Sequence, residues 1–414
     1  MLTVSDCHAD LRLFRRGLVR CTVQVLCPPT PASGAAANKM SEPVAPSSTP
    51  LRTGISTEAR RFLEERPGGG AYLDPTSGSV TYELTHAGVA RLRADNTDAA
   101  AAGCARVQAE LGTKVEDAVV GGVPVVWVTP RSVRGTEVAL YMFGGAFVVG
   151  TPEDDLSISA RLADELGRRV CAPRYRRAPE HPFPAARDDA MAVYRALQAD
   201  ESCGGVLVVG ESAGANLAWG LTLNLARLSD LTPPMAVALL SPWLDLTHGG
   251  DSHTTLHYVD PTLSVPYQLD PAAKAYAGGR PTASPDISPL FAELPPGPVS
   301  PTIICSATRD LLLSDSLRLA SKLSARGDPV ELRVADGLWH VFEWCASPAA
   351  SPPQLLGGIP HASLHCPSSS SMPALVSLDR YPDIPEAAES VKAIATFLSE
   401  HMSGVATAKR PRVR

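Results

Sequence analysis

The sequence is short of three features, each of which would point to a different class of protein. Its nine cysteines are scattered singly among 414 residues, without a CxxC pair or a regular spacing, so neither a zinc site nor a redox motif is predicted. No apolar run approaches the roughly 20 residues that cross a bilayer, so no stable membrane insertion is expected. Positive charge is also scarce, with 37 Lys and Arg against 43 Asp and Glu, which argues against a nucleic-acid partner.

The composition that remains is ordinary for a soluble globular protein with a sizeable core, at 44% hydrophobic and 19% charged residues. The odd number of cysteines in a long chain favours a reducing compartment, and the expected location is cytoplasmic. At about 150 residues per domain the length allows two to three domains, although an α/β fold of roughly 250 to 300 residues often stands as one.

Low-complexity segments divide the chain. Residues 1–54 combine an Arg-containing leader with a Pro/Ala/Ser-rich linker and are predicted to be disordered. A targeting peptide for an organelle is the alternative, weakened by two early aspartates. Residues 345–380 are Ser/Pro-rich without a clear period and are predicted to be a late insertion, such as a retained intron. Residues 403–414 form a basic tail, and its KRPRVR run favours a solvated tail over a nuclear-import patch.

Short apolar runs alternate with helical stretches through the rest of the chain, which is typical of βαβ units and a mainly parallel sheet. Two regions, 248–290 and 345–380, stand outside the alternation, and two further helical stretches precede it, one from Ser56 and one near residues 87–112. The predicted strands are Val119–Val128, Glu137–Met142, Arg169–Arg174, Gly205–Gly210, Met235–Leu240, Thr302–Ser306 and Val330–Val334. The predicted helices between them are Leu156–Leu166, Ala185–Ala199, Ala213–Leu228 and Ser314–Arg326.

The central motif is the sequence GESAG, which follows the apolar run GVLVV and opens an Ala/Leu-rich helix. A serine on a sharp strand-to-helix turn is pushed out at the end of the sheet, and the flanking glycines make room for it. The helix N-terminus behind it offers free N–H groups to a developing oxyanion. The motif therefore predicts Ser212 as a nucleophile, against the alternative of a Gly-rich turn in an ordinary βαβ unit.

A serine nucleophile on such a turn is followed along the chain by an acid and then a histidine. His340 directly follows a strand-like run, whereas the other downstream histidines lie in weaker contexts: His248, His253, His257, His361, His365 and His401. Asp310 lies just past the apolar run TIIC, where sites in open α/β sheets gather. The nearby Asp315 is expected to act as a helix cap or first-turn acid instead. Asp310 is expected to orient His340 without taking its proton.

A third strand end carries a Gly-rich turn, Phe143-Gly144-Gly145-Ala146, in the run VALYMFGGAFVVGT. Small residues let the backbone turn its N–H groups toward a substrate. Together with the N–H of Ala213 they would form an oxyanion hole. The alternative is a simple tight turn.

At this point the sequence resembles the hormone-sensitive-lipase-like branch of the α/β-hydrolase-fold esterases. The resemblance covers 55–344 and 381–402 and rests on six motifs in family order: LYMFGGAFVVGT, RYRRAPEHPFPAARDDA, VVGESAGANLA, SPWLDLT, ATRDLLLSDS and WHVFE. It implies an α/β-hydrolase fold with a mainly parallel central sheet flanked by helices, and a helical cap built from 55–112 and 248–290. It also implies hydrolysis of small to medium esters, and of some lactones, without a cofactor or metal.

The family's His-Gly-Gly-Gly pattern assigns the oxyanion donors to Gly145 and Ala146, with Gly144 as a further possibility. Phe143 stands where the family has its loop-bracing histidine, which is the main departure. Tyr175 falls in a motif that the resemblance makes structural.

Three functions stay open at this point. The leading one is a serine carboxylesterase acting on a small-molecule ester or lactone, in which Ser212, Asp310 and His340 form the triad. The second is a ligand-binding protein that has lost catalysis, as in the similar gibberellin receptors, which lack the histidine that is present here. The third is a serine peptidase on the same fold, for which the sequence shows none of the propeller-like or other extra domain that would be expected. A homodimer also stays open.

Overall fold

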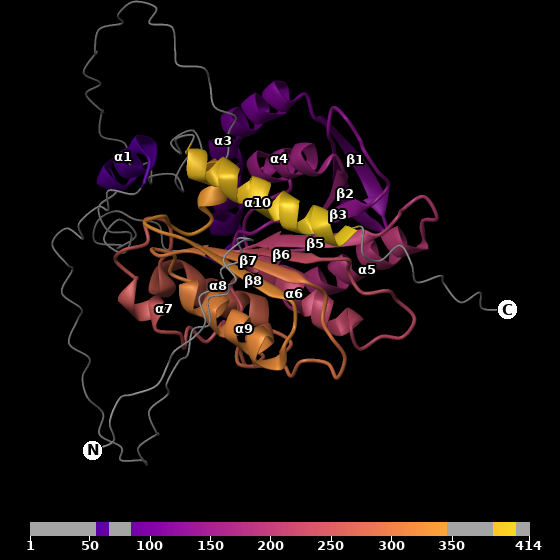
Figure 1. Ribbon diagram of the computed structural model, residues 1–414. Helices are drawn as coiled ribbons and strands as arrows, with labels where there is room; N and C mark the ends of the chain where they lie inside the picture. Colours follow the sequence, from indigo (N-terminus) through magenta and orange to yellow (C-terminus); the bar gives the residue numbers. More distant parts are fainter. Residues whose placement is uncertain (1–54, 66–83, 346–383, 403–414) are drawn as a thin grey trace, which may run out of the picture. The chain divides into compact units, whose positions relative to one another are not determined.

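The computed structural model describes residues 55–65, 84–345 and 384–402 (Figure 1). The predicted leader, most of the predicted insertion and the basic tail lie outside these residues. Eight strands form one sheet in the order β1-β2-β4-β3-β5-β6-β7-β8. They are β1 (Lys114–Val120), β2 (Val123–Thr129), β3 (Val138–Met142), β4 (Arg169–Pro173), β5 (Val206–Glu211), β6 (Val237–Leu240), β7 (Thr302–Ala307) and β8 (Val330–Ala335).

The sheet is mainly parallel, as predicted. From β4 to β8 every neighbouring pair is parallel, while β2 pairs antiparallel with both β1 and β4. The strands β3, β5, β6 and β7 are buried along their whole length. This is why they consist of unbroken apolar runs rather than alternating patterns.

The single strand predicted over Val119–Val128 is wrong, because this stretch holds the end of β1 and most of β2. The two strands form a hairpin in which Val120 pairs with Val123. Gly121 and Gly122 make the turn with φ values of 60° and 80°. Positive φ at both central residues is the requirement of the commonest two-residue hairpin turn, and glycine meets it without a steric cost.

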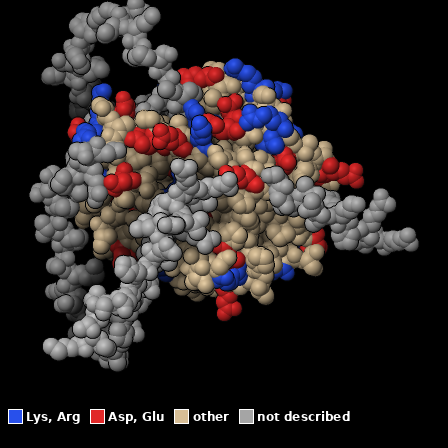
Figure 2. Space-filling view, in the orientation of Figure 1, with Lys and Arg blue, Asp and Glu red and all other residues tan. Residues whose placement is uncertain are grey.

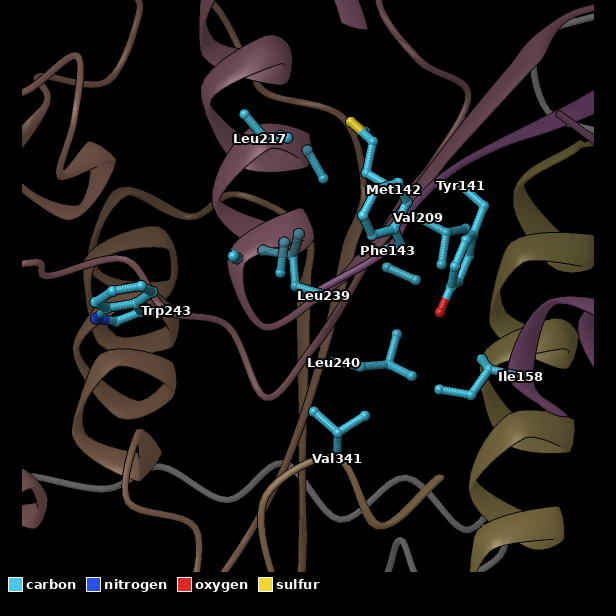
Figure 3. Close-up of a cluster of buried hydrophobic side chains, with 14 of the residues drawn as sticks. Tyr141, Met142, Phe143, Ile158, Val209, Leu217, Leu239, Leu240, Trp243 and Val341 are labelled. Carbon is cyan, nitrogen blue, oxygen red and sulfur yellow. The ribbon is translucent and has the colours of Figure 1, made fainter. Parts of the chain in front are cut away.

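Helices cover both faces of the sheet (Figure 1). On one face α4 (Leu156–Leu166) packs against α10 (Pro385–Met402), and on the other lie α5 (Ala185–Ala199), α6 (Ala213–Leu225) and α9 (Leu313–Arg326). Figure 3 shows part of the core, with Met142, Val209 and Leu239 of three neighbouring strands between Leu217 of α6 and Ile158 of α4. This framework fixes the strand ends that carry the site.

The two regions that were predicted to form a cap contain helices of their own. Residues 55–112 contain α1 (Thr57–Glu65) and α3 (His86–Leu111), and residues 248–290 contain α7 (Ser252–Thr255), η2 (Val265–Leu269) and α8 (Asp270–Ala277). Two more short turns of helix are η3 (Pro289–Phe291) and η4 (Phe342–Cys345). Their predicted role as a cap stays a prediction, although α1 reaches the site region: Phe62 stacks on Trp339 with ring centroids 4.2 Å apart.

Acidic and basic side chains lie side by side on the face shown in Figure 2. Ion pairs among the described residues include Arg168 with Glu137 at 2.6 Å and Arg93 with Glu180 at 2.8 Å. No helix among the described residues combines the length and the apolar character that a membrane crossing requires.

Candidate active site

Ser212 stands alone between a strand and a helix, since β5 ends at Glu211 and α6 begins at Ala213. Its backbone is strained, with φ 52° and ψ -118°. Neighbouring hydrogen bonds hold it there: its N–H donates to Leu240 O at 2.9 Å, and its carbonyl accepts from Trp243 N at 3.1 Å. A non-glycine residue in such a conformation persists only where its surroundings determine it. The turn is the one that the GESAG motif predicts.

The two glycines of the motif are required by close backbone contacts. A Cβ atom at Gly210 would lie 2.4 Å from Gly214 O, and one at Gly214 would lie 2.0 Å from Met142 O. Neither distance leaves room for a side chain. The glycines therefore allow the strand, the turn and the oxyanion loop to approach one another, which explains the GxSxG spacing in steric terms.

His340 lies between the predicted nucleophile and the predicted acid. Its Nε2 is 3.0 Å from Ser212 Oγ, and its Nδ1 is 3.0 Å from Asp310 Oδ1. All three side chains are buried or nearly so. If Nδ1 carries the ring proton toward the carboxylate, Nε2 is free to accept the proton of the serine hydroxyl. The structure thus brings together the three residues that the sequence singled out.

Asp310 is held in place by more than the imidazole. Its Oδ1 also accepts from Leu312 N at 2.9 Å, and its Oδ2 accepts from Ser306 Oγ at 2.9 Å. Burial alone would raise the pKa of Asp310, but the charge of His340 and the hydrogen bonds from His340 and Leu312 N outweigh burial and lower it. Burial alone would lower the pKa of His340, and the Asp310 charge raises it above its ordinary value. The pair therefore favours a charged carboxylate and stabilises an imidazolium.

The rival candidates lie elsewhere. Asp315 is a first-turn acid of α9, as expected, and its Oδ2 accepts from the backbone N–H groups of Leu244 and Asp245. Its Oδ1 lies 3.4 Å from the buried His253 Nε2. His401 bonds to Phe397 O within α10. His361 and His365 lie outside the described residues.

The oxyanion loop follows β3 and turns through three consecutive positive φ values, 98° at Gly145, 53° at Ala146 and 62° at Phe147. Within the described residues, the N–H groups of Gly145, Ala146 and Ala213 donate to no protein acceptor. Gly144 differs from them, because it packs against the buried carboxyl of Glu211 and its N–H faces that group. The first three are therefore the available donors.

Phe143 is buried and braces this loop by stacking. Its ring lies against Tyr175 with centroids 4.1 Å apart and planes 10° apart. The Tyr175 hydroxyl also donates to Phe143 O at 2.8 Å. The loop thus has a support from the ring and from the backbone at the position where the family pattern has a histidine.

Sequence reasoning missed a group of buried acids behind the site. Glu211, Asp155 and Glu343 are fully buried. Burial, and then the Asp155 charge, raises the pKa of Glu211, while the pKa of Asp155 rises to about 6 and that of Glu343 to about 7. Tyr141 Oη and Trp344 Nε1 donate to Asp155. The one signal in the sequence was an acidic residue inside the otherwise apolar end of β5.

Over 55–65, 84–345 and 384–402, no group of three His, Cys, Asp or Glu side chains is arranged to hold a metal ion. A serine hydroxyl, a histidine oriented by a carboxylate and three free N–H groups are the parts needed for acyl transfer.

Comparisons with known proteins give the family of the chain. A family model described as alpha/beta hydrolase fold matches residues 139–344. The chain is 35% identical to an acetyl-hydrolase of Streptomyces hygroscopicus over 56% of this chain and 77% of the relative. It is 32% identical to an esterase of Acinetobacter venetianus over 50% of this chain and 68% of the relative.

Two solved structures are also similar. The crystal structure of an esterase E25 matches 87% of this chain and 99% of its own, with a TM-score of 0.69 and 27% identity. That of an esterase from the bacterial hormone-sensitive lipase family matches 76% of this chain and 98% of its own, with a TM-score of 0.59 and 26% identity. The chain therefore belongs to the α/β-hydrolase-fold family, and within it to the ester hydrolases similar to hormone-sensitive lipase.

Proposed function

We propose that this protein hydrolyses short- to medium-chain carboxylic esters through a serine-bound acyl intermediate. The observation that carries the proposal is the continuous hydrogen-bonded line from Ser212 Oγ through the His340 ring to Asp310, with both distances at 3.0 Å. A nucleophile within reach of a base that is itself oriented by an acid is the diagnostic arrangement for covalent acyl transfer.

In the first half of the reaction, Ser212 Oγ attacks the ester carbonyl carbon while His340 Nε2 takes the hydroxyl proton. The carbonyl oxygen becomes an oxyanion and accepts hydrogen bonds from the N–H groups of Gly145, Ala146 and Ala213. The C–O bond to the alcohol then breaks, and the alcohol leaves with the proton from His340. Asp310 stays ionised and stabilises the imidazolium between these two transfers.

In the second half, water replaces the alcohol. His340 takes a proton from the water as its oxygen attacks the acyl carbon, and the same three N–H groups receive the second oxyanion. The bond to Ser212 Oγ breaks, the serine regains its proton from His340, and the carboxylic acid is released. No redox step or external cofactor enters this sequence.

The relatives support the short end of the acyl range. Besides the acetyl-hydrolase, an ethyl acetate hydrolase of Pseudomonas putida is 30% identical over 49% of this chain and 65% of the relative. A lactone is an internal ester, and the same steps would open it. The ligand-binding alternative is disfavoured by the intact contact between Ser212 and His340, because a receptor has no need of an aligned base.

The test compares the wild-type protein with Ser212→Ala on p-nitrophenyl esters of rising chain length and on one lactone. Removing the nucleophile is expected to lower kcat by roughly 10⁴-fold or more, with the wild-type rate highest on the short esters. Ser159→Ala is the matched control, because Ser159 is also buried but lies in α4. Equal rates for wild type and Ser212→Ala would exclude Ser212 as the nucleophile.

A further inference from the structure

The region 248–290 forms hydrogen bonds with the loop that carries Asp310. The residue after the acid, Leu311, has both of its backbone polar groups held by this region. Its N–H donates to Asp260 Oδ2 at 2.8 Å, and its carbonyl accepts from Ser252 Oγ at 2.7 Å. Ser252 is itself fixed, since it exchanges two 2.9 Å hydrogen bonds with Ser314. The position of the acid loop therefore depends on two side chains that follow β6.

Of the two side chains that bind the backbone of Leu311, Asp260 is the one that can carry a charge. It is fully buried, and its second oxygen accepts from both Thr262 N at 2.8 Å and Thr262 Oγ1 at 2.7 Å. A carboxylate taken out of water is tolerated only where hydrogen bonds replace its hydration. Three donors on two oxygens meet this need and fix the orientation of the group. Its electrostatic neighbours are His340 and Asp310.

We propose that Asp260 is a positioning residue of the triad, which fixes the loop of Asp310 and supplies a second carboxylate charge to the imidazolium of His340. The proposal rests on the proposed function, since it gives Asp260 a role only if Ser212, His340 and Asp310 act as a catalytic triad. Asp260 touches neither the serine nor the reacting carbonyl in this arrangement. It acts through Leu311 on the position of Asp310, and through its charge on the base.

The charges around His340 set the direction of the expected effect. Asp310 bonds to the ring, and Asp260 and Glu343 act on it from two further elements. His253 faces Asp310 from the side of α7. The carboxylates of Asp310, Asp260 and Glu343 each raise the pKa of His340. Loss of the Asp260 charge therefore lowers the pKa of His340.

Asp260 also titrates. Burial raises the pKa of Asp260 to about 6, against the lowering effect of His340 and of its hydrogen bonds. Above that pH it is charged, and it then supports the imidazolium in the range where His340 exchanges its proton. The neutral imidazole is the form that acts as base, so a lower pKa of His340 moves the acidic limb of the rate profile to lower pH.

The experiment measures kcat/KM on p-nitrophenyl acetate from pH 4 to pH 9 for the full chain. Asp260→Asn keeps the size of the side chain and removes its charge, and we expect its acidic limb to move down by about half a pH unit. We also expect a fall in kcat of about tenfold, because the base is less well supported in the transition state. Ser252→Ala is the matched control: it releases the other side of Leu311 without a change of charge, so kcat falls while the limb stays in place.

A second variant keeps the test open if Asp260→Asn does not fold. Thr262→Val removes one donor to Asp260, raises the pKa of that carboxyl and leaves it less charged, so the limb moves in the same direction by a smaller amount. A limb that stays at the wild-type pH in the folded variants overturns the proposal, because the charge of Asp260 then does not act on His340. Failure of the proposed function is distinguishable, because turnover would then survive Ser212→Ala.

Discussion

Ala146 is the residue at which backbone strain and the proposed chemistry meet. Its φ of 53° lies in the left-handed region, which costs an alanine roughly 1 to 2 kcal/mol. The conformation is held from both sides, by Val148 N donating to Gly145 O at 3.0 Å and by Ala178 N donating to Phe147 O at 2.9 Å. Among the described residues the N–H of Ala146 donates to no protein acceptor, which keeps it available for the proposed oxyanion where the family pattern has glycine.

Replacing this alanine by glycine removes the strain without removing the donor. We expect Ala146→Gly to raise the free energy of unfolding by about 1 kcal/mol, since relief of the positive φ exceeds the added freedom of the unfolded chain. Urea denaturation measures the change. Ala218→Gly inside α6 is the control and should lower stability by about 1 kcal/mol or more. A less stable Ala146→Gly protein would show that the loop does not strain its alanine.

At this scale the sequence predicted the residues whose chemistry is local and missed those whose role is tertiary. Ser212 could be recognised because its glycines, strand and helix are adjacent in the chain. The stack of Phe143 on Tyr175 joins residues 32 positions apart, and no sequence signal near Phe143 predicts this contact. Asp260 is one of four aspartates in the polar region 248–290, and only the folded chain brings it to Leu311.

At the scale of elements, boundaries were predictable where a local signal ends the element. The helices α4 and α5 have the predicted limits, and α4 stops at Gly167, which adopts φ 60°. That left-handed glycine is a common way to end a helix. The order of the strands was not predictable in this way. Strand β3 lies between β4 and β5 in the sheet, which depends on the handedness of the crossovers and not on the residues of β3.

The contact between Phe143, which follows β3, and Tyr175, which follows β4, can be tested by mutation. Tyr175→Phe keeps the ring stack on Phe143 but leaves the buried Phe143 carbonyl without its 2.8 Å donor. We expect kcat to fall about tenfold with KM nearly unchanged, because the loop donates to an oxygen that is charged only in the transition state. Steady-state kinetics on a short ester separates the two constants.

The matched control is Tyr194→Phe, which removes another buried hydroxyl that donates to a carbonyl, that of Thr232 at 2.7 Å. It lies between α5 and the loop before β6, away from the site, so stability should fall while kcat is kept. Equal falls in kcat for the two variants would mean that Tyr175 contributes to general stability and not to the loop.

At the scale of the whole molecule, α10 fastens the segment that follows His340. Ile384 N donates to Cys345 O at 3.2 Å, and Ser390 Oγ donates to Glu343 Oε1 at 2.9 Å. The two ends of the stretch 346–383 therefore meet at hydrogen-bonding distance. That residues 345–380 are an insertion stays a prediction, and the short distance between these two ends allows a direct test.

Replacing residues 346–383 with two glycines is expected to preserve the fold and kcat/KM, since two residues span the distance between Cys345 and Ile384. Each halving of a loop lowers its closure cost by about 0.6 kcal/mol, so the short variant should gain about 2 kcal/mol in the free energy of unfolding. A Gly/Ser segment of the original length is the control, because it changes the sequence and keeps the closure cost. It should retain wild-type activity and stability. Loss of kcat/KM in both variants, measured beside their unfolding curves, would instead make 346–383 a working part of the site.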